Sequence, residues 1–273
     1  MNEMKVEEAK PIFRWAGGKR WALPVILSLV EKISFENYHE PFLGGAAVFF
    51  ALKNKTSFLS DSNEALIDAY SALKEDPNNI IEELISLPKD EATYYQIRAR
   101  KFALEITEAT RFIYLNQLCF NGIYRVNSQG NFNVPFGKRS NFNFDIQNLK
   151  NVSDALQNVS LSCQDFTAGL SQIKSNDLVF LDPPYTISHN KNGFIAYNEK
   201  LFSLDDQHRL ALFIEEIKSR GAYFILTNAA HDAVRDIFAK SGRAIQLSRK
   251  SLIGGTNASR GDYQELFFTN IPK

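Results

Sequence analysis

One stretch decides the fold, Leu178-Val179-Phe180-Leu181-Asp182-Pro183-Pro184-Tyr185, in which an apolar run is followed by an acid, two prolines and an aromatic residue. A short run that is apolar at every position is typical of a strand buried on both faces, as in a parallel sheet covered by helices. In such folds ligands bind beyond the carboxyl ends of the strands, where we expect Asp182 and Tyr185. The prolines lack backbone donors, so nearby carbonyl oxygens remain as acceptors for a ligand.

Strands and helices are predicted to alternate around this stretch. Further short apolar runs that predict buried strands lie around Tyr38, at 57–59 and at 223–226. Apolar residues repeat with helical spacing at 210–217, after a predicted capping box of Ser203 and Asp206, and a later helix is predicted to end near Gly242. This alternation indicates an α/β fold.

The middle of the chain has a different pattern. Residues 64–116 are helical in their apolar spacing, and the following segment is rich in Asn, Gly, Ser and aromatic residues. Turn signals in that segment predict a hairpin with 132–136 as one arm. We therefore expect an α/β domain formed by 1–64 and 156–273, interrupted by a helical and hairpin insertion at 65–155.

A glycine-containing turn at 40–46 follows a predicted strand and precedes a helical stretch at 47–52. Glycines let a ligand approach the backbone closely, but the spacing differs from G-x-G-x-x-G, and the Glu40 carboxylate would repel a phosphate. S-adenosylmethionine carries a sulfonium and an ammonium without phosphate, so these charges favour it. Asp61, about 20 residues further on, is placed to bind ribose hydroxyls. A plain strand-turn-helix junction with a capping acid would have the same local sequence.

The segment Ala16-Gly17-Gly18-Lys19 superficially resembles a phosphate-binding loop. Its spacing is wrong, and Arg20 stands where Ser or Thr should follow the lysine. Lys19 is instead suited to pair with the carboxylate of a methionine moiety, and Trp15 to pack beside the ligand. Taken alone, either residue fits an ordinary turn position better than a binding role.

The end of the first stretch offers acceptors from Asp182 and the Pro183 carbonyl, and a flat ring from Tyr185. Two acceptors that bind the hydrogens of an exocyclic amine favour a more tetrahedral and more nucleophilic nitrogen, while the aromatic ring can stack on the base. Direct attack on a sulfonium methyl then requires mainly alignment. The bland alternative is a strand that ends in a proline turn.

Five motifs in order resemble those of Dam-type DNA adenine-N6 methyltransferases, the D12 or α class: FRWAGGKR at 13–20, HEPFLGGAAVFF at 39–50, LSDSNEALI at 59–67, FNGIYRVNSQGNFNVPFGK at 120–138 and LDPPY at 181–185. The resemblance spans nearly the whole chain. It implies a Rossmann-like S-adenosylmethionine-dependent methyltransferase sheet, with the insertion at 65–155 as a DNA-recognition domain. It also implies methyl transfer to N6 of adenine in double-stranded DNA, with GATC as the expected site.

The resemblance implies roles for individual residues. The catalytic motif is Asp182, Pro183, Pro184 and Tyr185. The implied cofactor-binding residues are Trp15, Lys19, Glu40, Pro41, Phe42, Gly44, Gly45, Asp61, Asp165, Phe166 and Asp182. Within that set, Asp165-Phe166 matches a pair that contacts the cofactor's adenine in similar enzymes. The implied cofactor is S-adenosylmethionine, with S-adenosylhomocysteine as product and no metal.

Adenine N6 is buried in a duplex, so the base must be flipped out at a cost of about a few kcal/mol. Arginine is the usual bidentate partner of guanine. The implied DNA-recognition residues are Arg14, Phe120, Asn121, Ile123, Arg125, Pro135, Lys138 and Arg139. Arg125 is expected to contact guanine, and Arg14 occupies the place of a reader of the first guanine. Arg14 replaces the more usual lysine, and Arg139 a common tyrosine. Alone, the basic residues fit a solvated hairpin better than a recognition role.

Composition limits the remaining possibilities. The formal net charge of 273 residues is zero, so DNA binding would need a local basic patch. The two cysteines form no disulfide or metal-ligand pattern, and no membrane span or secretion signal is visible, so we expect a cytoplasmic protein. A cognate restriction endonuclease that acts on the same site is a further expected partner.

Alternative functions remain open. Methylation of cytosine N4 or of RNA adenine uses similar chemistry, although the cytosine enzymes usually carry Ser where this chain has Asp182. A C5-cytosine enzyme would need a thiolate nucleophile, and neither cysteine follows a proline at a strand end. A catalytically inactive DNA-binding homologue and a phosphate-binding nucleotide enzyme are further alternatives; Glu40 opposes the latter.

Overall fold

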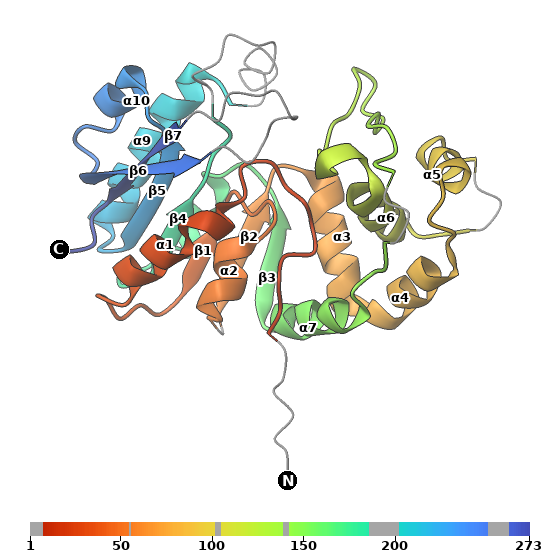
Figure 1. Ribbon diagram of the computed structural model, residues 1–273. Coiled ribbons are helices and arrows are strands. Elements are labelled where there is room, and N and C mark those ends of the chain that lie inside the picture. The colour runs from red at the N-terminus through yellow and green to blue at the C-terminus, as the bar shows by residue number, and fades with distance from the viewer. Residues whose placement is uncertain (1–7, 55, 102–104, 139–141, 186–201, 251–261) are drawn as a thin grey trace. The chain divides into compact units, whose positions relative to one another are not determined.

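The computed structural model describes residues 8–54, 56–101, 105–138, 142–185, 202–250 and 262–273 (Figure 1). Seven strands form a sheet in the order β3-β2-β1-β4-β5-β7-β6. The strands are β1 (Tyr38–Glu40), β2 (Ser57–Asp61), β3 (Val159–Cys163), β4 (Leu178–Leu181), β5 (Tyr223–Ala229), β6 (Arg243–Lys250) and β7 (Asp262–Thr269). β4 pairs in parallel with β1 and β5, and β2 with β3, whereas β7 is antiparallel to β5 and β6. The predicted α/β class and mostly parallel sheet are confirmed.

Helices account for most of the other elements. The α-helices are α1 (Leu23–Val30), α2 (Ala47–Leu52), α3 (Glu64–Glu75), α4 (Pro77–Ser86), α5 (Glu91–Arg98), α6 (Glu108–Leu118), α7 (Ile146–Leu156), α9 (Leu204–Ser219) and α10 (Asp232–Ile237). Short 3-10 helices are η1 (Lys19–Ala22), η2 (Phe120–Gly122) and η3 (Ala168–Gln172). Within the described ranges, every helix is too short or too polar to cross a membrane.

The chain divides into two compact units. The first unit comprises Met1–Pro24 and Leu43–Gln164, and the second comprises Val25–Phe42 and Asp165–Lys273. This division does not test the expected boundaries of an inserted DNA-recognition domain, which stay a prediction.

β4 is the middle strand of the seven-stranded sheet. All its residues are buried, and β1 and β5 pair with it on either side. Tyr38 lies opposite Leu178, and Leu181 lies opposite Leu226. α9 packs against β5 and buries apolar side chains such as Ile214 in the same core. The sequence Leu178–Leu181 is therefore apolar at every position because both of its faces are covered.

The first unit has an aromatic core among its helices. The ring of Phe13 packs edge-on against Tyr70 of α3 at 4.8 Å and against Phe112 of α6 at 5.3 Å between ring centroids. The hydroxyl of Tyr94 in α5 donates to the carbonyl of Val134 at 2.9 Å. The loop that contains Val134 is thus fixed to the helices by a buried hydrogen bond.

The ends of two helices test the capping predictions. Ser203 and Asp206 form the predicted capping box, with each side chain bonded to the backbone nitrogen of the other residue. α10 ends at Ile237, earlier than the predicted end near Gly242. Phe238 follows in a non-helical conformation and is fully buried, so its packing terminates the helix before the glycine is reached.

The predicted hairpin arm at 132–136 forms no continuous strand among the described residues. The chain nevertheless folds back on itself through isolated antiparallel bridges, Cys119 with Phe136 and Val126 with Phe132. A side chain at Gly137 would lie 2.7 Å from the Cys119 carbonyl oxygen, so the two backbones approach closely there. β3 and β6, which alternate polar and apolar residues, were not predicted.

A buried acid ties the start of β4 to β1. Asp177 is fully buried and accepts hydrogen bonds from the backbone and side chain of Asn37 at 3.1 and 2.8 Å and from Lys174 N at 2.9 Å. Its second oxygen also lies 2.9 Å from His39 Nε2. Burial lowers the pKa of His39, although the hydrogen bond and the charge of Asp177 act in the opposite direction.

We expect Asp177→Ala to lower the free energy of unfolding by about 3 kcal/mol, because it leaves several buried donors without an acceptor. Urea unfolding followed by circular dichroism measures this loss. Asp236→Ala removes an exposed acid from α10 in the same unit, and should change stability by less than about 0.5 kcal/mol. Equal effects of the two substitutions would contradict the assigned role of Asp177.

Candidate active site

The carboxyl end of β4 holds Asp182 in a fixed orientation. The Thr227 hydroxyl, on neighbouring β5, donates to Asp182 Oδ1 at 2.6 Å and lies 3.4 Å from the Leu181 carbonyl oxygen. Thr227 is fully buried, whereas Asp182 is half-buried. The carboxylate is therefore held from the core side by one short hydrogen bond and remains partly accessible.

Tyr185 is anchored by a buried acid of β7. Its hydroxyl donates to Glu265 Oε2 at 2.5 Å, and the Glu265 residue is only 2% exposed. Burial raises the pKa of Tyr185 well above its ordinary value, and the negative charges of Asp182 and Glu265 raise it further. The phenol therefore keeps its proton and acts as a donor, which holds the hydroxyl end of the side chain in place.

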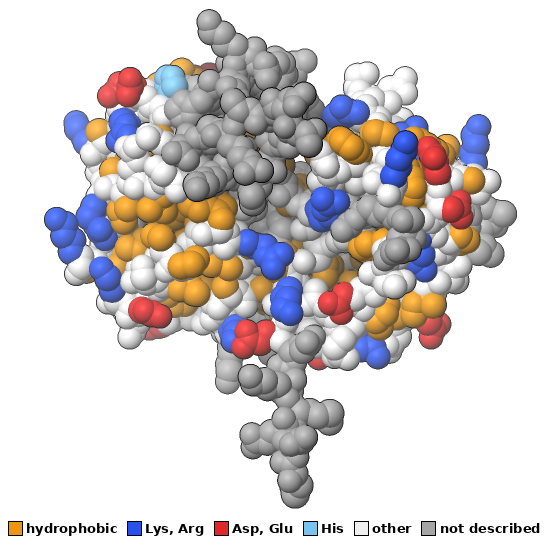
Figure 2. Space-filling model, viewed as in Figure 1, with side chains coloured by type: hydrophobic (Ala, Val, Ile, Leu, Met, Phe, Trp, Pro, Cys, Tyr) orange, Lys and Arg blue, Asp and Glu red, His pale blue; other side chains and the backbone are white. Residues whose placement is uncertain are grey.

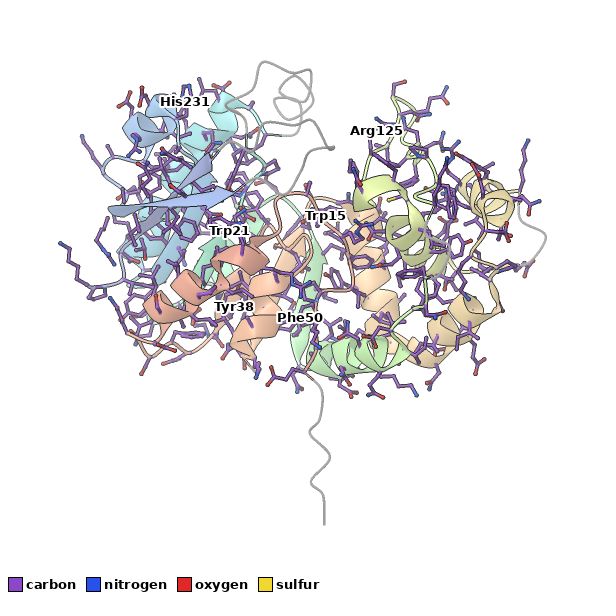
Figure 3. All side chains as sticks on the ribbon, in the orientation of Figure 1. Trp15, Trp21, Tyr38, Phe50, Arg125 and His231 are labelled. Carbon is purple, nitrogen blue, oxygen red and sulfur yellow. The ribbon has the colours of Figure 1, made fainter. Side chains whose placement is uncertain are left out.

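A second carboxylate lies at the end of β1 in the same unit. Glu40 is 3% exposed and accepts a hydrogen bond at 2.8 Å from the hydroxyl of Tyr38, which is labelled in Figure 3. Burial raises the pKa of Tyr38 far above its ordinary value, and the charges of Glu40 and of Asp182 both add to this effect. Both negative charges therefore raise the pKa of the same phenol. A region of negative electrostatic potential of this kind favours a cationic ligand.

Aromatic rings follow Glu40 in the sequence and pack within the second unit. Phe42 is stacked on Phe166 with ring centroids 5.3 Å apart and an interplanar angle of 27°, and Phe202 packs edge-on against Phe42 at 5.7 Å. Pro41 is buried, and Asp165, the neighbour of Phe166, is exposed. The second unit therefore brings Phe42 and Phe166 into or against one apolar cluster, with buried Pro41 directly before Phe42 and an exposed carboxylate next to Phe166.

The remaining predicted cofactor residues belong to the first unit and centre on Gly44. Its φ is +46°, and a side chain there would lie 2.7 Å from Trp15 Cδ1, so only glycine fits. The nitrogen of Gly44 donates to Asp61 Oδ2 at 3.0 Å, and Asn63 N donates to Oδ1 at 3.0 Å. A Cβ atom at Gly45 would be 3.3 Å from the Phe13 carbonyl oxygen, so the backbones of these two residues approach closely.

Asp61 combines burial with backbone hydrogen bonds. Burial raises its pKa, and the hydrogen bonds from Gly44 and Asn63 only partly offset that effect. Each carboxylate oxygen has a further lone pair beyond the backbone bond it accepts. The side chain can therefore still accept hydrogen bonds from ligand hydroxyls.

Trp15 lies in the turn before η1, and Lys19 is the first residue of η1. The ring of Trp15 is stacked on Tyr124, with centroids 5.3 Å apart and planes inclined by 21°. Lys19 is 3% exposed, and its Nζ donates to the Gly17 carbonyl oxygen at 2.7 Å. A buried ammonium group with a backbone acceptor is compatible with the predicted contact to a ligand carboxylate.

The predicted DNA-recognition residues also lie in the first unit. The backbone of Arg14 is bonded in both directions to the side-chain amide of buried Asn116, at 2.9 and 3.0 Å. A side chain at Gly122, where φ is +64°, would overlap the Arg14 side chain. Arg14 therefore passes directly over η2, which contains Phe120 and Asn121.

η2 and the loop after it present the other predicted recognition residues. Phe120 is 52% exposed, and its nitrogen donates to the Pro135 carbonyl at 2.8 Å. Arg125 donates through Nε to Asn133 Oδ1 at 2.8 Å. Ile123 is half-buried and Lys138 is exposed. Arg139 lies outside the described residues.

Thr227, Glu265, Tyr124 and Asn133 are contacts that the sequence interpretation missed. Thr227 follows a predicted strand, but only the pairing of β4 with β5 shows that it faces Asp182. Glu265 follows Gln264 and directly precedes the apolar residues of β7, so its sequence context gives no signal of a buried role. Its partner depends on the antiparallel pairing of β7 and β5.

Comparison with known proteins identifies the family. The family model for D12 class N6 adenine-specific DNA methyltransferases matches residues 15–251, a span that includes Asp61, Asp182 and Thr227. The chain belongs to this family. The resemblance carried by the sequence motifs is thereby confirmed.

Relatives of this D12-class methyltransferase come from distant organisms. It is 39% identical over 245 residues to the type II methyltransferase M.MjaIII of Methanocaldococcus jannaschii, which covers 81% of this chain and 85% of that protein. It is 30% identical over 272 residues to the type II methyltransferase M1.LlaDCHI of Lactococcus lactis subsp. cremoris, covering 96% and 95%. A DNA adenine methylase of Vibrio cholerae is 28% identical over 280 residues, covering 98% of both chains.

We expect Gly44→Ala to destabilise the methyltransferase by about 2 kcal/mol, because the added methyl group must displace Trp15 and the backbone is held at positive φ. Urea unfolding measures the loss, and tryptophan fluorescence should report the moved ring. Gly130→Ala is the matched control, since Gly130 has a φ of +77° with nothing within 4 Å. That control should lose about 1 kcal/mol without a spectral change. A spectral change in the control alone would refute the assigned contact.

Proposed function

We propose that this D12-class enzyme transfers a methyl group from S-adenosylmethionine to N6 of adenine in duplex DNA within GATC, a reaction of class EC 2.1.1.72. The observation that carries the proposal is the Asp182 carboxylate, which Thr227 holds at 2.6 Å at the carboxyl end of β4, directly before Pro183. Family membership supports adenine in DNA as the substrate. The GATC sequence rests on the motif resemblance.

The residues of each unit fit the chemistry of S-adenosylmethionine. In the second unit, Glu40 and Asp182 supply negative charge suited to a sulfonium and an ammonium group. In the first unit, the close approach of Gly44 to Trp15 and the oxygens of Asp61 suit a nucleoside with ribose hydroxyls. When bound, the cofactor supplies an electrophilic methyl group. Among the described residues no cluster of His, Cys, Asp or Glu has the makings of a metal site.

The protein's own groups would act on the amine. Asp182 Oδ2 and the Pro183 carbonyl are proposed to accept the two hydrogens of adenine N6, which makes the nitrogen more tetrahedral and more nucleophilic. Pro184 restricts the turn that aims this carbonyl. Tyr185, anchored at its hydroxyl by Glu265, is proposed to stack on the base. Alignment then contributes most of the rate enhancement, without a covalent enzyme intermediate.

Access to the adenine would require base flipping. The exposed ring of Phe120 is suited to occupy the disturbed stack, and Arg14 and Arg125 are proposed to contact guanines. Asn121, Ile123, Pro135, Lys138 and Arg139 complete the proposed recognition set. On the face seen in Figure 2, Lys and Arg side chains are spread among apolar and uncharged ones. Specificity for the DNA sequence therefore has to come from the local set of recognition residues.

The biological setting is proposed from the same evidence. Residues 65–155 would form the inserted DNA-recognition domain, and 1–64 with 156–273 the catalytic domain, in a cytoplasmic protein. Two of the relatives named above are type II methyltransferases. Their names support a restriction endonuclease of the same specificity as a partner of this enzyme.

The direct test is incubation of the enzyme with a duplex DNA library and tritium-labelled S-adenosylmethionine, followed by mapping of N6-methyladenine. We expect label in GATC sites alone. Asp182→Ala should lower the rate at least about 100-fold, because the acceptor for the amine is lost. Asp205→Ala, which removes an exposed acid from α9, should retain activity.

Three results would reject the proposal. Label on cytosine N4 or only on RNA would assign a different substrate. Methylation of adenine in another sequence would reject the GATC recognition site but not the methylation of adenine in DNA. Full activity of folded Asp182→Ala would reject the role of the β4 carboxylate.

We expect Arg125→Ala to reduce discrimination at one guanine of the site by about 2 kcal/mol, or about 30-fold, because its bidentate contact is lost. Rates on GATC duplexes with single substitutions measure this effect. Lys150→Ala removes one exposed positive charge from α7 of the same unit and should leave discrimination unchanged. Uniform loss across all duplexes in the Arg125 variant would indicate a phosphate contact instead.

A further inference from the structure

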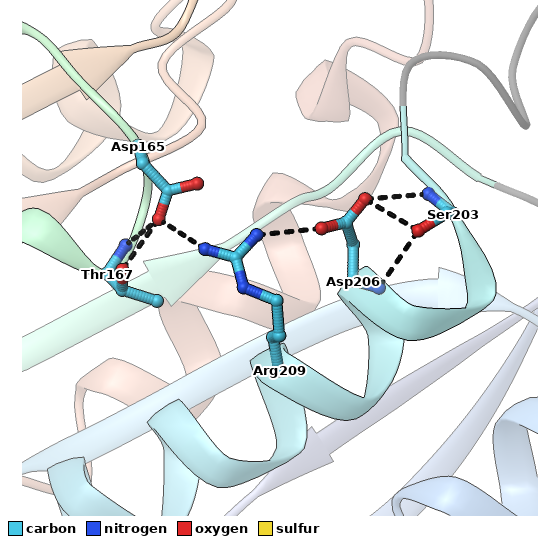
Figure 4. A network of polar contacts seen from close by, with 5 residues as sticks. All are labelled: Asp165, Thr167, Ser203, Asp206 and Arg209. Carbon is cyan, nitrogen blue, oxygen red and sulfur yellow. Dashed lines mark hydrogen bonds and ion pairs between the residues drawn. The ribbon is translucent and has the colours of Figure 1, made fainter.

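A polar network lies beside the aromatic cluster of the second unit (Figure 4). Asp165 Oδ1 accepts three hydrogen bonds: from Thr167 N at 3.0 Å, Thr167 Oγ1 at 2.6 Å and an Arg209 terminal nitrogen at 2.9 Å. Within the described part of the chain, Oδ2 accepts none, and Figure 4 shows it directed away from Thr167 and Arg209. One oxygen is therefore saturated by protein donors, while the other is presented outward as an acceptor.

Arg209 is itself held from two sides. Its other terminal nitrogen donates to Asp206 Oδ1 at 2.7 Å, and Asp206 Oδ2 accepts from the nitrogen and hydroxyl of Ser203 at the start of α9. The guanidinium carbon lies 4.9 Å from the centroid of the Phe166 ring. The planar fork thus bridges two carboxylates and lies on an aromatic ring, a combination that lysine cannot reproduce.

The network contributes little to stability by itself. The side chains of Arg209 and Asp165 are 46% and 47% exposed, and exposed ion pairs typically contribute about 0–1 kcal/mol. Its effect on orientation is larger, because every contact to Asp165 falls on one oxygen. Burial acts to raise the pKa of Asp165, but hydrogen bonds from Thr167 and Arg209 lower it overall. The outward oxygen therefore stays an anionic acceptor at neutral pH.

The surroundings of that oxygen select a chemical class of ligand. An anionic acceptor next to the stacked rings of Phe42 and Phe166 suits a flat heterocycle that carries a hydrogen-bond donor on its rim. An exocyclic amine satisfies this requirement. A carbonyl oxygen at the same place would face the carboxylate oxygen with no hydrogen between the two acceptors. This arrangement leaves a polar group without a partner and weakens binding.

We propose that Arg209 is a positioning residue that orients Asp165 to accept a hydrogen bond from the 6-amino group of the cofactor's purine, and so sets the preference for 6-amino over 6-oxo purines. This inference rests on the proposed use of S-adenosylmethionine. Arg209 acts through Asp165 and through the ring of Phe166, and it takes no part in methyl transfer.

The test is isothermal titration of the full-length protein with S-adenosylhomocysteine and S-inosylhomocysteine. The variants are Arg209→Gln, Arg209→Lys, Asp165→Asn and the double variant. Lys218→Gln is the matched control, because Lys218 forms an ion pair with Glu215 on the same helix at 2.9 Å. Arg209→Gln should lose about 10-fold in affinity for the adenosine ligand and little for the inosine ligand.

Arg209→Lys should resemble Arg209→Gln, since it keeps the charge but lacks the fork. The double variant should bind the adenosine ligand no more weakly than Asp165→Asn alone, because both substitutions remove the same hydrogen bond to that ligand. In Arg209→Gln, methyl transfer at saturating cofactor should stay within about twofold of wild type, so the loss appears in KM and not in kcat. Lys218→Gln should leave both affinities unchanged.

If Arg209→Gln bound the two ligands with the same affinity ratio as the wild type, the inference would be overturned. The proposed methyl-transfer function would still stand. Equal loss for both ligands, accompanied by a lower Tm, would assign Arg209 a structural role and would also overturn it. A wild-type protein that bound neither ligand would overturn the proposed function together with this inference.

Discussion

The parallel pairing of β4 with β1 and β5 is the constraint on which the candidate site depends. β4 has only apolar residues, and its burial from both sides fixes the point at which the chain leaves the sheet. Asp182 is the first residue beyond that point, and Thr227 on β5 bonds to it at 2.6 Å. The orientation of one carboxylate is thereby coupled to the hydrophobic core, which tolerates little displacement.

Three acids of the candidate site are held by neutral donors. Glu40 and Glu265 each accept from a tyrosine hydroxyl, and Asp182 accepts from a threonine hydroxyl. Neutral donors satisfy a carboxylate without cancelling its charge. The negative field therefore persists beside the ends of β1 and β4. A protein whose formal net charge is zero can in this way keep a locally anionic region.

In the first unit, close contacts at glycines, and not charges, determine how the chain segments pack. Gly44 and Gly122 both have positive φ, and a side chain at either would strike Trp15 or Arg14. These glycines bring the N-terminal segment that carries Trp15 and Arg14 against the turn before α2 and against η2. The segment holds residues proposed for the cofactor and for DNA, so two backbone turns determine where both kinds of side chain lie.

The sequence by itself determined the fold class, the family and the core strands, because an apolar run such as Leu178–Leu181 and ordered motifs are local properties of the chain. It also located Asp182, Tyr185 and the glycine turn. Only the tertiary structure decided which side chains hold them, namely Thr227, Glu265 and Arg209. These partners are separated by more than 40 positions from the residues they bind. Strand order and register bring Thr227 and Glu265 to their partners, while the packing of α9 places Arg209, and local sequence encodes neither.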